Sequence, residues 1–144
     1  MEPIIHEDQK RKVAAFIPYR RHGDEYEFFL QKRDMNAKTN PGLFGIFGGG
    51  IENEETFYEG LMREVMEELV YEPQTARYFC KYEIATTVLH VCIEQVGIDF
   101  ESKVKVQEGE YGKFFTTSEI KELVAISPLA KIIFVQVSDF LSKN

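Results

Sequence analysis

Residues 49–71 read GGIENEETFYEGLMREVMEELVY, which is typical of a glycine-rich turn followed by an amphipathic helix. From about residue 56 to residue 69 the apolar side chains recur at helical spacing. They form one stripe that we expect to be buried, made of Tyr58, Leu61, Met62, Val65, Met66 and Leu69. Glu64, Glu67 and Glu68 are three and four residues apart, so their carboxylates share one flank beside that stripe.

This group of carboxylates predicts a bound divalent cation. Like charges at that spacing repel by roughly a few tenths of a kcal/mol per pair, and magnesium or manganese, which prefer oxygen ligands, would remove that cost. The glycines around Gly49 let the backbone come close and direct a carbonyl at the same cation. Gly60 either leaves room for this site or is simply a tolerated helix glycine, which costs about 1 kcal/mol relative to alanine. The alternative for the glutamates is a solvated helix face, as in most charge runs.

The spacing resembles the Nudix box, Gly-x5-Glu-x7-Arg-Glu-U-x-Glu-Glu-x-Gly-U, in which U is a bulky apolar residue. Its fixed positions are matched without a gap by Gly49, Glu55, Arg63, Glu64, Val65, Glu67 and Glu68. Two positions depart from the pattern, since Val70 replaces a glycine and Tyr71 an aliphatic residue. The family's glycine ends the helix in a left-handed conformation, which a β-branched residue adopts poorly. We therefore predict that the helix continues through Val70 and ends before Pro73, and the alternative is a distorted cap at Val70.

The composition bounds the class of protein. The 144 residues, 44% hydrophobic and 28% charged, are enough for one globular domain, which we expect to span residues 1–144. A net charge of −7 argues against a nucleic-acid polymer as partner, but not against a phosphate substrate, because bound cations supply positive charge. Cys80 and Cys92 lack metal-site spacing and are expected to be buried free thiols. We see no membrane-spanning run and no signal-peptide core, so we expect a cytoplasmic protein.

Runs of β-branched and aromatic residues predict the strands of a sheet. The predicted strands cover residues 12–19, 26–33, 43–47, 75–84 and 86–96, and residues 104–115 read as strand, turn and strand. The first two form a hairpin, with Pro18 marking an edge or an end and with Arg20 and Arg21 solvated in the turn. His90 is expected to be a hydrogen-bonded residue of the sheet rather than a metal ligand. Residues 1–9 are polar and predict a frayed or edge segment.

Two further helices are predicted near the C-terminus. A capping box of Thr116 and Glu119 begins a short one, and Ser127 followed by Pro128 begins a longer one. The longer helix repeats Leu129, Ile132, Ile133, Gln136, Val137, Phe140 and Leu141 at helical spacing. One central and one C-terminal helix cover the two faces of a sheet, which predicts an α/β sandwich with a mixed β-sheet. The resemblance implies the same fold, because Nudix domains are α/β/α sandwiches.

Candidate site residues also lie outside the box. Arg33 ends a strand ahead of a polar loop, and its guanidinium can form a forked pair with a substrate phosphate. Phe44 is either core packing or a surface on which a base stacks. The turn before Tyr111 carries Glu108 and Glu110, which are either polar turn residues or the source of one extra carboxylate, as residues of this region often are in Nudix enzymes.

The Nudix resemblance implies a hydrolase that cleaves a nucleoside diphosphate linked to another group, of the nucleotide-sugar or nucleoside triphosphate type. It implies magnesium ligands at Glu64, Glu67 and Glu68 with a carbonyl from the Gly49 region, while manganese is a possible replacement. Arg63 and Glu55 would hold the loop on the helix as an ion pair, and the general base would be a helix carboxylate, Glu108 or Glu110. A sanitising pyrophosphatase for oxidised nucleoside triphosphates and a nucleotide-binding module without catalysis remain alternatives. The partner is a small nucleotide, and a homodimer is left open.

Overall fold

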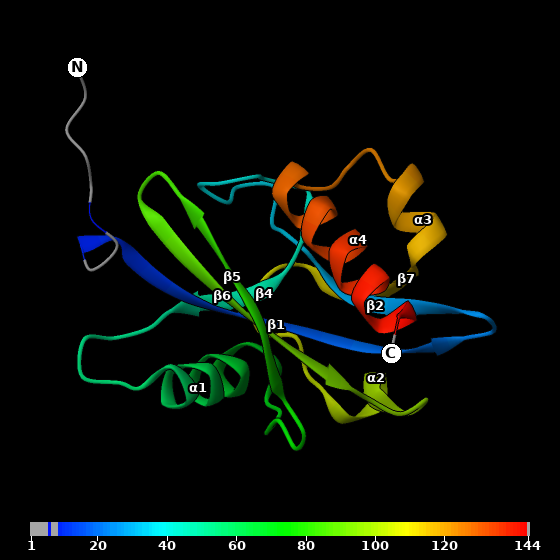
Figure 1. Ribbon diagram of the computed structural model, residues 1–144, viewed down its shortest axis with the longest axis horizontal. Helices are drawn as coiled ribbons and strands as arrows, with labels where there is room; N and C mark the ends of the chain where they lie inside the picture. Colours follow the sequence, from blue (N-terminus) through cyan, green and yellow to red (C-terminus); the bar gives the residue numbers. More distant parts are fainter. Residues whose placement is uncertain (1–5, 7–8, 144) are drawn as a thin grey trace.

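The computed structural model describes residue 6 and residues 9–143 of the chain. Within these residues, seven strands form one sheet with helices on both faces (Figure 1). The strands are β1 (Arg11–His22), β2 (Glu25–Lys32), β3 (Phe44–Gly45), β4 (Phe47–Gly50), β5 (Arg77–Ile84), β6 (Thr87–Gln95) and β7 (Tyr111–Thr116). The helices are α1 (Phe57–Leu69), α2 (Phe100–Lys103), α3 (Thr117–Glu122) and α4 (Pro128–Ser142).

The sheet is mixed, as predicted. β1 is its central strand: it runs parallel to β6 and antiparallel to both β2 and β4. The expectation that Pro18 marks an edge or an end is wrong, because β1 continues to His22. On one side β1 pairs with β4 up to Phe16 and with β2 from Tyr19, so Pro18, which has no N–H to donate, falls between the two pairings.

Side chains that alternate along β1 point to two separate cores. Ala15 and Ile17 belong to a cluster with the buried residues of α4, whereas Ala14 and Phe16 belong to a cluster with those of α1. This alternation is the period of two expected of a strand, and it places α1 and α4 on opposite faces of the sheet. The predicted α/β sandwich is therefore confirmed.

The helix of the box begins where the sequence predicts and buries a narrower face than expected. Thr56 caps it: its hydroxyl accepts the Glu59 N–H at 3.1 Å, and the Glu59 carboxylate accepts the Thr56 N–H at 2.9 Å. Tyr58 and Met66 are 56% and 45% exposed, so their inclusion in the buried stripe was wrong. The residues that α1 buries are Gly60, Leu61, Val65, Glu68 and Leu69.

The prediction that α1 continues through Val70 is wrong. Val70 lies in the left-handed region at φ 51° and ψ 48°, and its N–H donates to the Met66 carbonyl. The reason lies far along the chain, where the N–H of Lys105 donates to the Leu69 carbonyl at 2.8 Å and that of Gln107 to the Glu68 carbonyl at 2.7 Å. These bonds occupy carbonyls that another helical turn would need, so the helix ends in the family's cap with a valine in the glycine position.

Replacing Val70 with glycine should therefore stabilise the protein. Glycine adopts the left-handed conformation without the cost that a Cβ imposes, and we expect a gain of up to about 1 kcal/mol in the free energy of unfolding. In a thermal melt this corresponds to roughly 3–4 °C. Val70→Ala keeps the Cβ and is the matched control, which should gain much less. A lower melting temperature for Val70→Gly than for wild type would contradict the observed cap.

Several other predictions need correction. Residues 104–107 are not a strand, because the N–H groups of Lys105 and Gln107 bind the end of α1 instead, and α2 precedes them. The apolar run 43–47 is divided between β3 and β4. On α4, Ile132 is 52% and Phe140 37% exposed, so the buried face overlaps the predicted stripe but is rotated about the helix axis. It consists of Ala130, Ile133, Phe134, Val137, Ser138 and Leu141.

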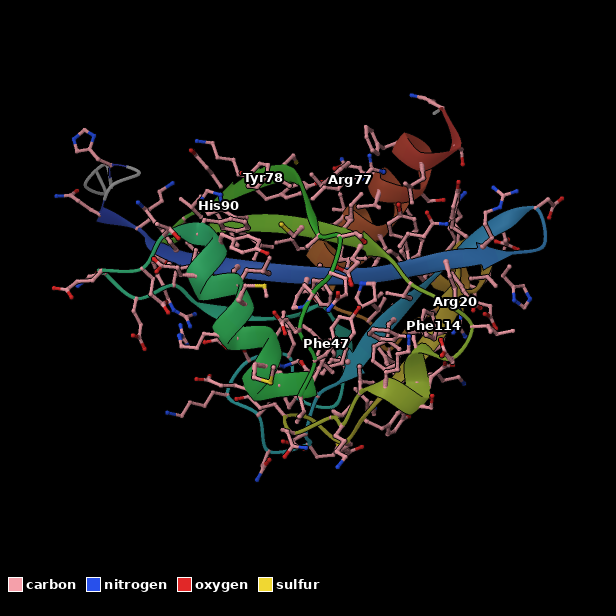
Figure 2. The ribbon with its side chains drawn as sticks, turned by 90° about the horizontal axis from the view of Figure 1, so that it is seen from below. Arg20, Phe47, Arg77, Tyr78, His90 and Phe114 are labelled. Atoms are coloured by element: carbon pink, nitrogen blue, oxygen red, sulfur yellow. The ribbon has the colours of Figure 1, made fainter. Side chains whose placement is uncertain are left out.

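Arg20 is not a solvated turn residue. Its Nη1 and Nη2 donate to the Glu101 carboxylate at 2.7 and 2.9 Å, and its guanidinium lies 3.7 Å from the centre of the Phe114 ring. Figure 2 shows Arg20 and Phe114 together at one end of the sheet. The pKa of Arg20 is raised, chiefly by the hydrogen bonds with Glu101. The strands also extend to His22 and resume at Glu25, so this hairpin turn is shorter than predicted.

The remaining expectations concern single residues and the N-terminus. Cys80 and Cys92 are free, as predicted, but only Cys92 is buried, whereas Cys80 is half-buried, contrary to expectation. His90 Nδ1 lies 2.9 Å from the Tyr78 hydroxyl, so it is a hydrogen-bonded residue of the sheet (Figure 2). Of the predicted N-terminal segment, residues 1–5, 7 and 8 lie outside the described residues. Among the helices described, none has the length and hydropathy required to cross a membrane.

Candidate active site

A cleft of about 490 Å³ lies where β4 passes between β1 and α1. Its floor is the glycine strand, and its walls come from α1, from β1 and from two loops. The residues that line it are Arg11, Val13, Ala15, Arg33, Thr39, Ile46, Phe47, Gly48, Gly49, Gly50, Glu64 and Glu108. The cleft therefore brings together the box, Arg33 and one of the two turn glutamates.

Arg63 holds the helix against the glycine strand. Its Nε and Nη2 form a forked pair with the Glu55 carboxylate at 2.6 and 2.8 Å, and Nη2 also donates to the Gly50 carbonyl at 2.9 Å. Nη1 reaches Glu64 at 2.9 Å. The hydrogen bonds from Arg63 and from the Glu52 N–H lower the pKa of Glu55 to about 2, and the hydrogen bonds of Arg63 with Glu55 and then Glu64 raise the pKa of Arg63. The ion pair expected between Arg63 and Glu55 is present, and it joins loop, strand and helix.

Glu64 lies directly against the backbone of Gly49. A Cβ placed on Gly49 would be 2.2 Å from the Glu64 Oε2 atom, which is far inside van der Waals contact. The glycine thus allows the carboxylate to reach the floor of the cleft. The neighbouring Gly48 is required for another reason, since a Cβ there would be 2.2 Å from the Ala14 carbonyl oxygen of β1. Gly49 therefore leaves room for the Glu64 carboxylate, and Gly48 leaves room for the backbone of β1.

Glu68 is a buried carboxyl that lacks a full set of partners. Only 1% of it is exposed, and within the described part of the chain its Oε1 has no hydrogen-bond partner. Burial, followed by the hydrogen bond with Glu108 and the charges of Glu108 and Glu64, raises the pKa of Glu68 to about 9. A buried polar atom without a partner is costly, so this oxygen is a candidate to bind a cation.

Glu108, rather than Glu110, joins the carboxylate cluster. Its turn is fixed at both ends, because the Gln31 side chain donates to the Glu108 carbonyl at 3.0 Å and the Glu110 N–H donates to the Lys32 carbonyl at 2.8 Å. Glu108 contacts Glu68 and lines the cleft. Glu110 is exposed and lines none of the described cavities, so its assignment as a catalytic residue is not supported by its position.

The donor set suits a hard divalent cation. Glu64 lines the cleft, and the buried Glu68 is close enough to Glu64 for their charges to interact. Glu67, one turn from Glu64, has a 57% exposed side chain that can turn toward them. In the described residues no three His, Cys, Asp or Glu side chains already form a complete metal site, and Glu64 and Glu67 instead form ion pairs with Arg63 at 2.9 and 3.3 Å. Oxygen ligands and the buried Oε1 of Glu68 fit magnesium or manganese.

The protonated state of Glu68 predicts how stability depends on pH without a cation. Its pKa is about 9 in the folded protein against 4.5 for the ordinary side chain, so between these values the folded state binds more protons than the unfolded state. Stability must then fall as the pH rises from about 5 to about 9. We expect metal-free wild type to lose more melting temperature between pH 6 and pH 9 than Glu68→Gln, which cannot ionise. Parallel pH profiles for the two proteins would refute this assignment.

The structure places three further residues that the sequence singled out, Arg33, Phe44 and Gly60, in different surroundings. Arg33 lines the cleft, where its Nε donates to the Thr39 carbonyl at 2.8 Å. Phe44 is 8% exposed and packs edge-on against Phe115 at a ring distance of 4.8 Å, so it belongs to the core and offers no surface for a base. A Cβ on Gly60 would approach Ile51 and Glu55 at 3.1 and 3.2 Å, so its small size lets the loop pack on the helix.

Sequence reasoning missed Arg11 as a residue of the cleft. A Cβ on Gly50 would lie 3.2 Å from Arg11 Nη2, so the guanidinium lies over the glycine strand. Arg11 and Arg33 thus place two cations on a cleft that also holds carboxylates. The basic run at residues 10–12 was a signal in the sequence, but only the pairing of β1 with β4 brings it to the glycines.

Comparison with known proteins shows which protein family the chain matches. A family model described as NUDIX domain matches residues 9–133, which confirms the resemblance seen in the box. No curated protein matches the chain.

Solved structures share the fold. The NUDIX domain of Shewanella oneidensis NrtR, complexed with ADP ribose, is 13% identical with a TM-score of 0.68, over 88% of this chain and 84% of that one. A MutT protein from Methanosarcina mazei Go1 is 22% identical with a TM-score of 0.64, over 94% and 99%. A mutT/nudix family protein from Listeria innocua is 14% identical with a TM-score of 0.68, over 92% and 95%. At these identities the likeness concerns the fold.

Proposed function

Since the chain belongs to the Nudix family, we propose that it is a divalent-cation-dependent pyrophosphohydrolase acting on a nucleoside diphosphate derivative. The observation that carries this proposal is the pair of carboxyl groups on α1, Glu64 against the glycine strand and Glu68 with its unpartnered Oε1. The ADP ribose bound by the NrtR domain supports a nucleotide as the ligand of this fold. The catalytic role is favoured over simple binding, because all three helix glutamates of the box are retained.

The side chains divide the work of the reaction. Glu64, Glu67 and Glu68 would hold magnesium, which when bound neutralises the charge of the phosphate oxygens. Arg63 and Glu55 keep the ligands in place by fixing α1 to β4. Arg11 and Arg33 line the same cleft and would bind the phosphates. The Nε and Nη2 groups of Arg33 also donate to Thr39, so we expect the forked hydrogen bond to come from Arg11.

Glu108 is the general base that we favour. It is exposed to solvent, contacts Glu68 and is fixed by its turn at the edge of the cleft. An ionised carboxylate in that position can accept the proton of an attacking water molecule. The helix glutamates are less suited to this role, because the cation would occupy their oxygens.

Activity on any nucleotide should require an added divalent cation. We expect magnesium or manganese to restore hydrolysis after treatment with chelator, and calcium to replace them poorly, since it prefers more ligands and looser geometry. The measurement is release of phosphate-containing products from a panel of nucleoside diphosphate derivatives and nucleoside triphosphates. Full hydrolysis in the presence of excess chelator would refute the cation site, and hydrolysis of no member of the panel with magnesium would refute the proposed activity.

A further inference from the structure

Two smaller hollows extend the cleft in different directions, and Arg33 borders all three. The first, which we call the polar pocket, has a volume of about 300 Å³ and shares Glu108 with the cleft. The second, the apolar pocket, has about 150 Å³ and shares Ile46 with the cleft. A ligand with a phosphoanhydride in the cleft can therefore extend a group into each pocket.

The two pockets differ in the chemistry of their walls. Side chains of Ile46, Leu89, Leu129 and Ile133 line the apolar pocket, with Ser127 and Asn40 as polar groups, which suits a flat and partly apolar ring. The polar pocket is lined by Gln31, Asp34, Gln107 and Glu108. Among the residues that line the polar pocket, Arg33 is the single cation, and it already donates to Thr39 at 2.8 and 3.3 Å.

The polar pocket is a fixed structure. Gln31 is 4% exposed and donates to the Glu108 carbonyl at 3.0 Å. The backbone at Gly109 has φ +84°, and a Cβ there would lie 2.6 Å from the Lys32 carbonyl oxygen, so the turn packs tightly on β2. Across the pocket, the Asp34 carbonyl accepts the N–H groups of Ala37 and Gly42 at 3.1 and 3.0 Å. The carboxylates of Asp34 and Glu108 thus stand on anchored backbone.

We propose that the polar pocket binds a neutral, hydroxyl-rich group, so that the substrate is a nucleoside diphosphate sugar rather than a nucleoside triphosphate. Sugar hydroxyls can donate to the Asp34 carboxylate and to the amide oxygens of the glutamines. A terminal phosphate would lie beside the acidic residues Asp34 and Glu108, while the one cation of the pocket, Arg33, donates to Thr39 and also borders the phosphates in the cleft. Such like-charge contacts discriminate strongly against a ligand. This inference rests on the proposed hydrolytic function and specifies its substrate class.

The reaction is balanced for such a substrate. The oxygen of one water molecule forms a bond to one phosphorus, and the bridging P–O bond breaks, with its electron pair remaining on the departing phosphate. One proton of the water is taken by the general base and passes to solvent, and the other remains on the new phosphate. The products are a nucleoside monophosphate and a sugar phosphate, and no oxidant, reductant or further reactant is needed.

The test compares pairs of substrates that share a base: UDP-glucose with UTP, ADP-ribose with ATP, and GDP-mannose with GTP. With magnesium, and for the base that the enzyme prefers, wild type should show a kcat/KM at least about tenfold higher for the nucleoside diphosphate sugar than for the nucleoside triphosphate. Asp34→Lys should reduce that ratio by about tenfold or more, because it removes a hydroxyl acceptor and adds a phosphate-binding cation. Asp24→Lys, the same charge change on the exposed β1–β2 turn, is the matched control and should leave the ratio unchanged.

Binding of the same pairs, measured by calorimetry with calcium present, separates the two proposals. A sugar preference in binding that Asp34→Lys weakens would support the polar pocket even if turnover were absent, in which case only the hydrolytic function would fail. A preference for the triphosphate in both binding and turnover would overturn the inference. Equal effects of Asp34→Lys and Asp24→Lys on the ratio would also overturn it, because the pocket would then contribute no more than net charge.

Discussion

Replacing Glu67 or Glu68 with glutamine is expected to reduce turnover by at least about a hundredfold while leaving the fold intact. The amide keeps the size of the side chain and one oxygen, but it removes the charge that holds the cation. For Glu68, glutamine also resembles the protonated carboxyl that the metal-free protein contains, since its pKa is about 9. Without metal, the melting temperature of Glu68→Gln should therefore be unchanged, and that of Glu67→Gln unchanged or slightly higher, because the latter removes a repelling carboxylate. Steady-state rates with magnesium and thermal melts of the metal-free proteins measure the two effects.

Glu59→Gln provides the control on the same helix. Glu59 accepts the Thr56 N–H in the capping box, and glutamine fills that position equally well. This variant should therefore keep both its activity and its stability. If Glu67→Gln, Glu68→Gln and Glu59→Gln all retained activity close to wild type, the glutamates of α1 would be an ordinary solvated face, and the proposed hydrolase site would be wrong.

The second large effect is expected from Gly49→Ala. The added Cβ would lie 2.2 Å from Glu64 Oε2, so the carboxylate must leave the floor of the cleft and its 2.9 Å contact with Arg63. A displacement of about 1 Å in a catalytic group can cost roughly a hundredfold in rate, and we expect a loss of that order in kcat/KM. The fold should survive, because the atom that must move is the end of a flexible side chain.

Two other glycines act as controls for Gly49→Ala. Gly97 lines none of the described cavities, and an added Cβ would meet only the end of the Asp99 side chain at 3.1 Å, so Gly97→Ala should leave kcat/KM nearly unchanged. A Cβ on Gly48 would clash with the Ala14 carbonyl of β1, which is backbone and cannot move aside, so Gly48→Ala should lower the melting temperature. Wild-type activity in Gly49→Ala would show that Glu64 does not need its observed position.

The features that the sequence predicted correctly are those fixed by local spacing. Glu55 and Arg63 are eight residues apart across one turn and one helix, so their pairing follows from the geometry of α1 and its cap. The mixed sheet between two helices likewise follows from alternating and helical patterns over single elements. The capping boxes at Thr56 and Thr116 are local in the same sense, and both are present in the structure.

The features that it missed depend on contacts between distant segments. The choice between Glu108 and Glu110 is made by hydrogen bonds to β2, and Arg11 reaches the cleft only through the pairing of β1 with β4. Arg20 was assigned to solvent because its partner Glu101 lies 81 positions away. Val70 was expected to be helical because its neighbours in the sequence allow a helix there. The hydrogen bonds from Lys105 and Gln107 to the last carbonyls of α1 end the helix before it.

The hydrogen bonds from Lys105 and Gln107 to the end of α1 also have a consequence for the order in which the protein assembles and opens. They close a loop of more than thirty residues, so the last turn of α1 cannot be completed until the segment that carries Glu108 has arrived. Breaking them would release the helix end and the segment that carries Glu108, the proposed general base, in one event, which makes the two a single cooperative unit in native-state hydrogen exchange. The amide protons of Lys105, Gln107 and Val70 should therefore exchange with a common free energy, and ligand binding in the cleft should slow all three together.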